Sequence, residues 1–248
     1  MSRVIASIEA RMGASRLPGK VLMDIAGRPA LGHMVERIRR SQKIDDLIIA
    51  TTDSSNDDPI AEWARKNDIH VFRGSEEDVL DRVVQAHRTL KTDIVVELCG
   101  DCPLISPQVL DLGVETFLQN DCDVVSTIRH ESYPNGIDVQ VFRFTALEKI
   151  AETITDPTVR EHVSLYFYEN PEIYNVINLV APSAWKRPDY RLVLDYPEDL
   201  ELLRGIYRDL GRELGRTDFD LEDLIPYLDN HPDLLEINSS CEEKSVRP

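Results

Sequence analysis

The amino-acid sequence predicts an α/β protein with a doubly wound, mostly parallel sheet and a small inserted α+β subdomain. From residue 4 to residue 128, apolar β-rich runs alternate with segments of helical period, which is typical of βαβ units. After Arg129 the pattern changes to a turn signal followed by alternating apolar and polar residues, as in an antiparallel strand. The length of 248 residues fits one such domain, because single hydrophobic cores stop growing near this size.

The parallel part of the sheet is predicted from strands that alternate with helices. The strands are VIASI (4–8), LIIAT (47–51), IHVF (69–72), DIVVEL (93–98) and DVVSTI (123–128). The helices cover residues 31–38, 60–64, 79–90 and 107–118. Because a helix follows each of the first four strands, consecutive strands are expected to run in the same direction.

The rest of the chain is expected to complete the domain differently. In residues 130–185, YPNG predicts a turn, IDVQVF (137–142) predicts a half-buried antiparallel strand, and helices follow near 146–152 and 159–168. YRLVLD (190–195) is expected to return to the sheet as its last strand, before a helix over 200–210. We therefore predict one domain over residues 1–238, with 130–185 as its subdomain and 239–248 as a flexible tail.

Composition and charge exclude nucleic acid as a partner. Acidic residues outnumber basic ones by 45 to 28, and the net charge of −17 repels the phosphate backbone of DNA or RNA. The first twenty residues have the opposite balance, with Arg3, Arg11, Arg16 and Lys20 against Glu9. This local positive charge predicts a site for a small anion.

The sequence also predicts a cytoplasmic protein with no membrane partner. No apolar run reaches the roughly eighteen residues needed to cross a membrane, and MSRVIASIEA lacks the blocks of a signal peptide. Four scattered cysteines do not make a disulfide framework, so we expect reduced thiols. Cys99 and Cys102 flank Gly100 and Asp101, and we expect both cysteines to be buried as small apolar residues rather than to bind zinc or to react.

The basic residues near the start gather in one loop, A-R-M-G-A-S-R-L-P-G-K (10–20), directly after the first predicted strand. Loops at the carboxyl ends of parallel strands border the ligand crevice, where Gly13 and Gly19 let backbone N–H groups approach phosphate oxygens. Arg11, Arg16 and Lys20 add positive charge, so the loop is predicted to hold a triphosphate. A surface turn with solvated arginines is the alternative, which the position after the strand disfavours. The loop matches neither a Walker A nor a G-x-G-x-x-G pattern, which disfavours kinases and dehydrogenases.

The segment R-M-G-A-S-R-L-P-G-K resembles the amino-terminal signature of the cytidylyltransferases that activate acid sugars, the CMP-3-deoxy-manno-octulosonate and CMP-neuraminate synthetases. The resemblance is closest to the branch of spore coat polysaccharide biosynthesis protein F, and it extends over nearly all of the chain. The following KVLMDIAGRPALGHMVERI is also similar to the family, where a short hairpin, here turning at Gly27, precedes the first long helix. The resemblance implies a Rossmann-like nucleotidyltransferase fold.

The resemblance also implies a set of nucleotide-binding residues, with Lys20, Arg11 and Arg16 as the catalytic ones among them. The expected nucleotide contacts are Ala10, Arg11, Met12, Gly13, Ser15, Arg16, Lys20, Arg82 and Asp101. Arg82 lies in GSEEDVLDR, which resembles the family's segment near the base. That segment is equally explained as the capped start of an amphipathic helix, and the two interpretations are compatible.

Two aspartates are the candidate ligands of Mg²⁺. Asp101 follows the strand DIVVEL in CGDCP, and Asp195 ends YRLVLD just before Pro-Glu-Asp. Carboxylates at such edges can reach one hard cation, which needs only one or two of them beside water and phosphate oxygens. An aspartate at a turn is often a cap instead, but the two together with the basic loop favour the metal site. The resembling enzymes hold their metal at the matching positions, although Tyr196 replaces their frequent threonine.

The acceptor is expected to bind near residues 130–185. YPNGIDVQVF resembles the family's acceptor-side strand, which implies contacts from Tyr133, Asn135 and Asp138, although an Asn-Gly hairpin would explain Asn135 without a ligand. REHVSLYFYENP is also similar to the family and adds Glu161 and His162, although a lone helical histidine is more often structural. The same subdomain forms a dimer interface in the resembling enzymes, which implies a homodimer.

The predicted function is therefore the transfer of CMP from CTP to a sugar or sugar-like acceptor, with release of pyrophosphate, for synthesis of surface polysaccharide or glycoconjugate. The alternatives are a guanylyl- or uridylyltransferase that acts on a sugar 1-phosphate, and a non-catalytic nucleotide-binding protein of the same fold. Intact Lys20, Asp101 and Asp195 favour an enzyme over the binding protein. A nicotinamide oxidoreductase is disfavoured because its glycine fingerprint is absent.

Overall fold

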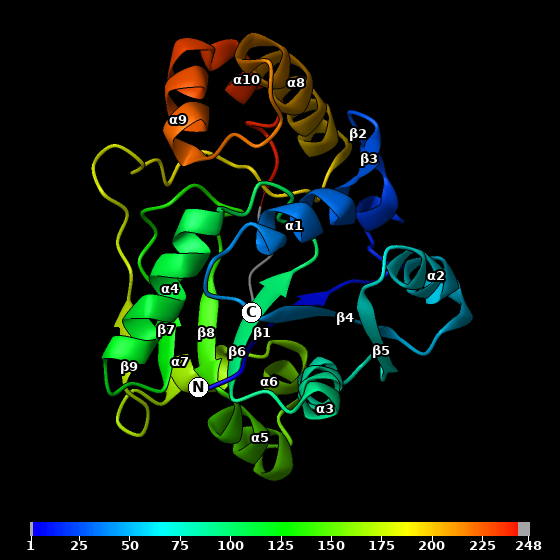
Figure 1. Cartoon of the computed structure of the whole chain (residues 1–248), viewed down its shortest axis with the longest axis vertical. Helices are drawn as coiled ribbons and strands as arrows, with labels where there is room; N and C mark the ends of the chain where they lie inside the picture. Colours follow the sequence, from blue (N-terminus) through cyan, green and yellow to red (C-terminus); the bar gives the residue numbers. More distant parts are fainter. Residues whose placement is uncertain (1, 243–248) are drawn as a thin grey trace.

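A computed structural model of the chain, which describes residues 2–242, shows a seven-stranded sheet between layers of helices (Figure 1). In chain order the strands are β1 (Val4–Glu9), β4 (Asp46–Thr52), β5 (His70–Gly74), β6 (Ile94–Cys99), β7 (Val124–Ser126), β8 (Gln140–Arg143) and β9 (Val176–Asn178). Their order across the sheet is β5-β4-β1-β6-β8-β7-β9. Only β8 runs against its neighbours, β6 and β7, while the other pairings are parallel. The predicted fold class is confirmed.

Helices cover both faces of this sheet. One face carries α1 (Ala30–Arg39), α2 (Asp58–Lys66) and α4 (Pro107–Gln119), and the other carries α3 (Val79–Leu90), α5 (Phe144–Thr153), α6 (Pro157–Glu161) and α7 (Leu165–Glu169). Alternate residues of β1 supply the two cores, with Ala6 and Ile8 on the α1 side and Ile5 on the α3 side. Both faces of the sheet are therefore buried, as is usual for parallel strands.

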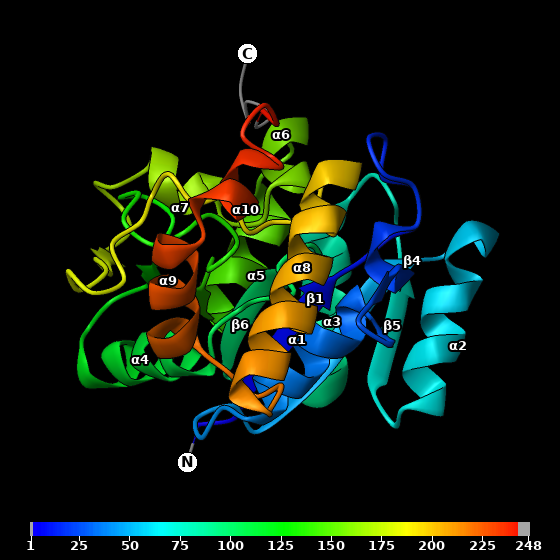
Figure 2. The same ribbon diagram turned by 90° about the horizontal axis from the view of Figure 1, so that it is seen from above.

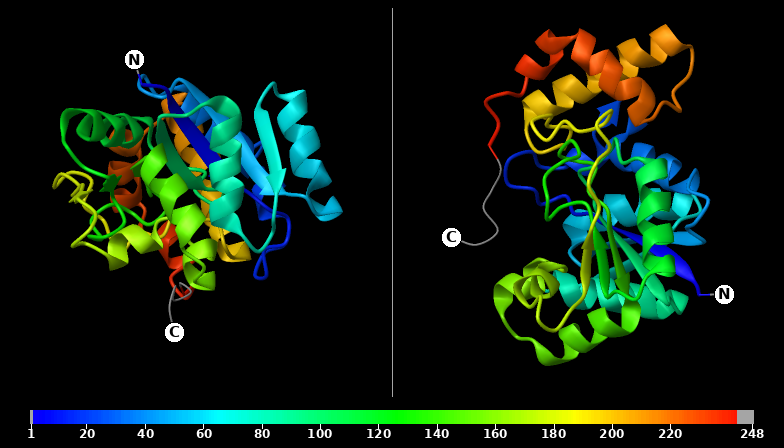
Figure 3. Two further views of the ribbon diagram at one scale, coloured as in Figure 1. Left: turned by 90° about the horizontal axis from the view of Figure 1, so that it is seen from below. Right: turned by 90° about the vertical axis from the view of Figure 1, so that its left-hand side faces the viewer.

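A further helical layer lies outside α1. It consists of α8 (Pro197–Leu214), α9 (Leu221–Asn230) and α10 (Pro232–Glu236), and Figure 2 shows α8 crossing over α1. The rings of His33 in α1 and Tyr207 in α8 meet with their centroids 3.9 Å apart. The right-hand view of Figure 3 shows this layer on one side of the molecule and α5–α7 on the opposite side, with the sheet between them.

The elements with a clear local signal are where the sequence places them. The helix predicted over 79–90 is α3, and the helix predicted over 107–118 is α4, one residue longer. The short hairpin expected at Gly27 is formed by β2 (Asp24–Ile25) and β3 (Arg28–Pro29). Ala26 and Gly27 both have positive φ, of 51° and 88°, as a two-residue turn of this kind requires.

The segment 190–195 is not the last strand of the sheet, so that prediction is wrong. Its backbone instead bonds to two loops: Asn135 N donates to Tyr190 O at 2.9 Å, Leu192 N to Asn135 O at 2.8 Å, and Leu194 N to Asp101 O at 2.8 Å. The apolar run reflects burial of Leu192 and Leu194, which are both 0% exposed. An irregular segment that is buried against loops at the carboxyl ends of the strands has as many apolar residues as a strand, so the two cannot be told apart by this pattern. The seventh strand is β9.

The strand β8 is central rather than half-buried, which corrects a second prediction. Gln140, Val141 and Phe142 are all at most 5% exposed. Gly113 of α4 lies against Val141 on one face, and the ring of Phe142 stacks on Phe167 of α7 on the other, at 5.1 Å. Helices on both sides therefore bury the polar as well as the apolar positions of this strand.

The turn at YPNG is also not a tight hairpin. Asn135 forms a parallel bridge with Arg191, and β7 and β8 are joined by a long connection. Gly136 has φ of 97°, and a Cβ there would lie 2.8 Å from the carbonyl carbon of Leu192. Glycine is needed because the segment 190–195 passes so close to the backbone.

Residues 130–185 are built into the main sheet through β8 and β9, and their helices α5–α7 cover one of its faces. The helix predicted over 159–168 is two short helices, α6 and α7, which are separated at residues 162–164. Part of the predicted tail, residues 239–242, follows α10, and the carbonyl of Glu242 accepts a hydrogen bond from Arg16 at 3.3 Å. The remainder, residues 243–248, lies outside the described residues.

Two further expectations concern cysteines and membranes. The four cysteines are free, and Cys102 and Cys122 are buried, but Cys99 is exposed, so its predicted burial is wrong. Its side chain stands at the end of β6, where the sheet opens onto a cavity. Among residues 2–242, no helix is long and apolar enough to cross a membrane.

Candidate active site

The loop over residues 10–20 is folded back on itself at the carboxyl end of β1. The amide of Met12 donates to the Asp57 carboxylate at 2.7 Å, and its carbonyl accepts from Gly19 N at 2.9 Å. Gly19 has φ of 75° and starts the 3-10 turn Lys20–Leu22. Asp57 is 2% exposed, and the sequence analysis did not identify it. The sequence feature that could have pointed to it is its place in the loop after β4.

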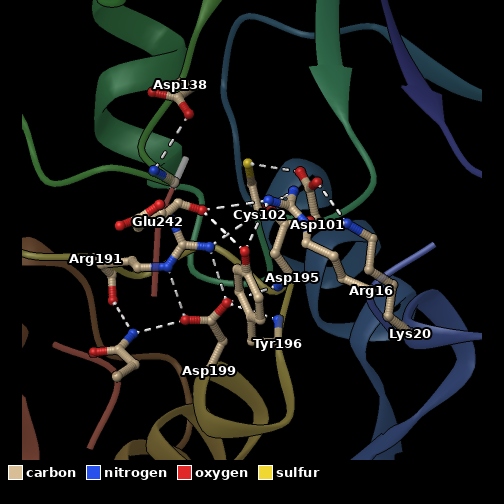
Figure 4. A network of polar contacts seen from close by, with 12 residues as sticks. Arg16, Lys20, Asp101, Cys102, Asp138, Arg191, Asp195, Tyr196, Asp199 and Glu242 are labelled. Atoms are coloured by element: carbon tan, nitrogen blue, oxygen red, sulfur yellow. Dashed lines mark hydrogen bonds and ion pairs between the residues drawn. The ribbon is translucent and has the colours of Figure 1, made fainter. Parts of the chain in front are cut away.

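This turn aims Lys20 at two carboxylates from distant parts of the chain. Lys20 Nζ lies 2.7 Å from Asp101 Oδ2 and 2.7 Å from Asp195 Oδ1 (Figure 4). Burial of Lys20, which is 8% exposed, acts to lower its pKa, but the two carboxylates outweigh burial and raise it. The predicted convergence of Lys20, Asp101 and Asp195 is present in the structure.

Asp195 is held in place by several basic and backbone groups. Arg16 lies 2.6 Å from Asp195 Oδ2, and Arg191 lies 3.5 Å from the same oxygen. Burial raises the pKa of Asp195, but Lys20, Arg16 and Arg191 together lower it below its usual value. The carboxylate of Asp199, which is fully buried, accepts the amides of Asp195 and Tyr196 at 2.8 and 2.9 Å as the cap of α8.

A cavity of about 580 Å³ opens beside this cluster. Of the predicted site residues it brings together Ala10, Arg11, Ser15, Arg16, Lys20, Arg82, Asp101, Glu161, His162 and Asp195. Residues from β1, α3, β6, α6 and the segment before α8 thus face one space. Its position at the carboxyl ends of parallel strands is where ligands bind in open α/β sheets.

Met12 and Gly13 do not line this cavity. Met12 acts through its backbone, which holds the loop closed. Arg82 is 3% exposed and donates to the carbonyl of Ser75, so it orders the loop before α3 as well as bordering the cavity. Burial lowers the pKa of Arg82.

The other predicted acceptor residues lie around a second cavity of about 320 Å³. Tyr133, Asn135 and Asp138 line it, together with Arg191. Because Arg191 contacts Asp195, which lines the first cavity, one ion-pair cluster separates the two spaces. Glu161 and His162 belong to the first cavity, so the predicted acceptor residues are divided between two cavities.

A close pair of carboxyl groups, one half-buried and one buried, was not identified from the sequence. Glu9 and Glu97, from adjacent strands, lie with Cys99 so that their ligand atoms fall within 4.8 Å of one another. Burial raises the pKa of both carboxyl groups, and their proximity raises that of Glu9 further. Glu97 also accepts from Gln140, whose carbonyl oxygen accepts from Tyr168 at 2.5 Å. A lone glutamate in the apolar run DIVVEL gave no sign of this network.

The residues of the central cluster suit a hard divalent cation. Asp101 and Asp195 offer only oxygen donors and retain 22% and 17% side-chain exposure at the cavity. Such carboxylates, completed by water and phosphate oxygens, are the usual ligands of Mg²⁺. Two carboxylates beside a basic loop can hold a metal–triphosphate complex, which a lysine and two arginines can neutralise further.

A sheet of this order, with a basic loop after its first strand and paired carboxylates at its edge, defines a nucleotidyltransferase. The cytidylyltransferase family profile matches residues 5–235, and the chain belongs to this family. Its relatives include the spore coat polysaccharide biosynthesis protein SpsF of Bacillus subtilis, 34% identical over 94% of this chain and 97% of the relative. An uncharacterized protein of Methanocaldococcus jannaschii is 38% identical over 99% of this chain and 98% of its own length.

Solved structures agree with this family. A cytidylyltransferase from Leptospira borgpetersenii superposes with a TM-score of 0.89 at 32% identity and covers 99% of this chain and 100% of its own. The resemblance in the loop over residues 10–20 therefore identified the family correctly.

Proposed function

We propose that this chain transfers CMP from CTP to a sugar or sugar-like acceptor, releases pyrophosphate, and supplies the product for surface polysaccharide or glycoconjugate synthesis. The observation that carries the proposal is the convergence of Lys20, Asp101 and Asp195 at one cavity. Family membership favours CTP over the GTP or UTP of the alternative transferases. The spore coat polysaccharide role of the Bacillus subtilis relative supports the polysaccharide pathway.

The two cavities supply places for the two substrates. We assign the triphosphate to the larger cavity, where Arg11, Arg16 and Lys20 lie. We assign the acceptor to the smaller one, where Tyr133, Asn135 and Asp138 offer hydroxyl, amide and carboxylate groups to sugar hydroxyls. Glu161 and His162, at the larger cavity, would contact the part of the acceptor nearest the nucleotide.

The proposed reaction is a displacement at the α-phosphorus. An acceptor oxygen attacks the α-phosphorus, a new P–O bond forms, and the bond to the β-phosphate oxygen breaks so that pyrophosphate leaves with its electron pair. Lys20, Arg11 and Arg16 would neutralise the charge that builds on the phosphate oxygens, and this contribution is greatest where water is excluded. Arg191 and the Asp199 cap keep Asp195 in position during these steps.

We further propose that Mg²⁺ is the cofactor, held by Asp101 and Asp195. When bound, the ion would neutralise phosphate oxygens and lower the pKa of an acceptor hydroxyl. Among residues 2–242, Glu9, Glu97 and Cys99 form the other close group of candidate ligands, but it includes a thiol, which suits softer metals better than Mg²⁺.

We also propose that the protein is a cytoplasmic homodimer. The strand β9 is at the edge of the sheet, so one side of its backbone is available for pairing. Ile173 and Val180, on either side of β9, are 61% and 59% exposed, and they are apolar side chains that a second subunit paired along β9 would cover. Sedimentation at micromolar protein concentration distinguishes a dimer from a monomer.

The test of the catalytic proposal has two stages. Thermal unfolding is measured with CTP, GTP, UTP, ATP and NAD⁺, each with and without Mg²⁺, because a ligand that prefers the native state raises its apparent stability. We expect a Mg²⁺-dependent shift with CTP, followed by pyrophosphate release in a screen of acidic sugars, sugar phosphates and phosphonates. A shift with CTP but no release with any acceptor would favour the non-catalytic binding protein.

A further inference from the structure

The ammonium group of Lys20 stands between the same two carboxylates that we assign to the metal. Its nitrogen is 2.7 Å from one oxygen of each aspartate, and its side chain is 10% exposed. An ammonium that donates to Asp101 Oδ2 and Asp195 Oδ1 takes one lone pair of each oxygen and puts a positive charge in the space between them that a divalent cation would occupy. Lys20 and the metal therefore compete for the same oxygens.

The remaining carboxylate oxygens are also engaged. Asp195 Oδ2 lies 2.6 Å from Arg16 and 3.5 Å from Arg191. Asp101 Oδ1 has a weak contact with the thiol of Cys102 at 3.6 Å. Arg191 is paired with Asp199, so Lys20 and Arg16 are the cations that balance the charges of Asp101 and Asp195. The balanced cluster has little net negative charge to attract a divalent cation that arrives without a counter-anion.

We propose, building on the proposed function, that Lys20 closes the metal site of the nucleotide-free protein and releases it when a triphosphate binds. Phosphate oxygens give the ammonium an alternative set of acceptors, and its four-carbon stem lets it turn toward the cavity. When the ammonium of Lys20 turns toward the phosphates, the partly buried carboxylates of Asp101 and Asp195 lose the positive charge that they shared. A divalent cation replaces that charge, so its binding becomes more favourable.

The consequence is positive coupling between the metal and CTP. Binding of either ligand makes binding of the other more favourable, because the ammonium of Lys20 cannot pair with the carboxylates and with the phosphates at the same time. By linkage, CTP tightens metal binding by the same factor by which the metal tightens CTP binding. A lysine that only contacted phosphate would strengthen CTP binding without weakening binding of the metal alone.

The test measures Mn²⁺ binding without nucleotide, by the loss of the free-ion EPR signal. In Lys20→Met the side chain stays unbranched, loses its charge and is one atom shorter, and we expect Mn²⁺ to bind about tenfold more tightly than in wild type, about 1.4 kcal/mol. Lys43→Met is the matched control, because it removes the same charge from an exposed pair with Glu115. Adding Asp195→Asn to Lys20→Met should reverse the gain. Circular dichroism verifies folding, and Lys20→Gln replaces the first variant if that one unfolds.

Equal Mn²⁺ affinity in Lys20→Met and Lys43→Met would overturn the proposal. So would wild-type affinity for Mn²⁺ that does not change on addition of CTP. These results are separable from failure of the catalytic function. If wild type releases pyrophosphate but Lys20→Met gains no Mn²⁺ affinity, the competition is wrong and the enzyme assignment stands. If Lys20→Met gains affinity but no acceptor is turned over, the competition stands without the catalytic function.

Discussion

The carboxylate of Asp199 pairs with the guanidinium of Arg191 through two hydrogen bonds, of 2.9 and 3.0 Å, in the interior of the protein. Asp199 is fully buried, and its oxygens also accept from the amides of Asp195 and Tyr196. One carboxylate thereby caps α8, neutralises Arg191 and orients the backbone of Asp195. The position of Asp195 beside Lys20 therefore depends on a residue that does not line the cavity.

Replacing Asp199 by asparagine should destabilise the protein strongly. The change keeps the shape of the side chain but leaves Arg191 without its buried counter-charge, and breaking such pairs costs about 3–5 kcal/mol. Urea unfolding followed by circular dichroism measures this loss. Glu198→Gln is the control, because the neighbouring Glu198 is exposed and should give a change near zero. Similar values for the two variants would show that Arg191 is not dependent on Asp199.

Asp101→Asn should lower turnover with little effect on folding. The side chain is 22% exposed, and it forms an ion pair of 2.7 Å with Lys20. Loss of one charged group that acts in the transition state typically reduces kcat by about 100-fold or more. Pyrophosphate release with CTP and a productive acceptor gives the rate, and thermal unfolding verifies the fold. Glu148→Gln, in an exposed pair with Arg88, should keep the wild-type rate. An ordinary rate in Asp101→Asn would remove this residue from the site.

The elements that the sequence predicted are those with a local cause. The amphipathic period and the Asp78 cap specify α3 without help from the rest of the chain. Residues 190–195 were misread because their burial against loops produces the same apolar run as a strand. Helices α9 and α10 were not predicted, although α9 has local signals, with a capping box of Asp220 and Asp223 and apolar residues at helical spacing from Leu221 to Leu228.

The site was predictable for a related reason. Lys20 and Asp101 follow parallel strands, whose carboxyl ends meet at one edge of a sheet. Asp195 reaches that edge although it does not end a strand, because Leu194 N bonds to the carbonyl of Asp101. The paired Glu9 and Glu97 were not predictable, since their proximity depends on the register between β1 and β6, and one strand alone does not specify that register.

Gly136→Ala should be costlier than the same change at another left-handed glycine. At Gly136 a Cβ would lie 2.8–2.9 Å from the backbone of residues 192 and 193, whereas at Gly215, with φ of 65°, nothing lies within 4 Å. Both variants incur the penalty of positive φ, about 1–2 kcal/mol, but only Gly136→Ala also forces two backbone segments apart. We expect its free energy of unfolding to fall by about 2 kcal/mol more than that of Gly215→Ala. Equal losses would show that residues 190–195 can move away freely.

Gly136→Ala should also weaken binding of the acceptor more than binding of the nucleotide. Asn135 precedes Gly136 and lines the smaller cavity, so a shift of this turn changes that cavity first. We expect KM for the acceptor to rise while the CTP-induced thermal shift stays near that of wild type. A loss confined to CTP binding would contradict the assignment of the two cavities to the two substrates.

His87 should make stability depend on pH in the weakly acidic range. It is fully buried, and burial lowers its pKa from 6.5 to about 3. The folded protein therefore keeps His87 neutral, while the unfolded chain takes up a proton as the pH falls below about 6.5. The unfolded state then binds more protons, so stability is lost between pH 6.5 and 3, at up to about 1.4 kcal/mol per pH unit. His33, with a pKa lowered to about 4 mainly by burial, acts in the same direction.

His87→Met should reduce this pH dependence. The substitution removes one titrating group, and because His87 Nε2 has no hydrogen-bond partner, loss of the ring leaves no unpaired partner atom on that side. The free energy of unfolding, measured in urea at pH 7, 6 and 5, should fall less steeply in His87→Met than in wild type. His130→Gln alters an exposed histidine and should keep the wild-type slope. If the free energy of unfolding of His87→Met falls with pH as steeply as that of wild type, His87 does not cause the pH dependence. Burial of a neutral His87 would then be the wrong explanation.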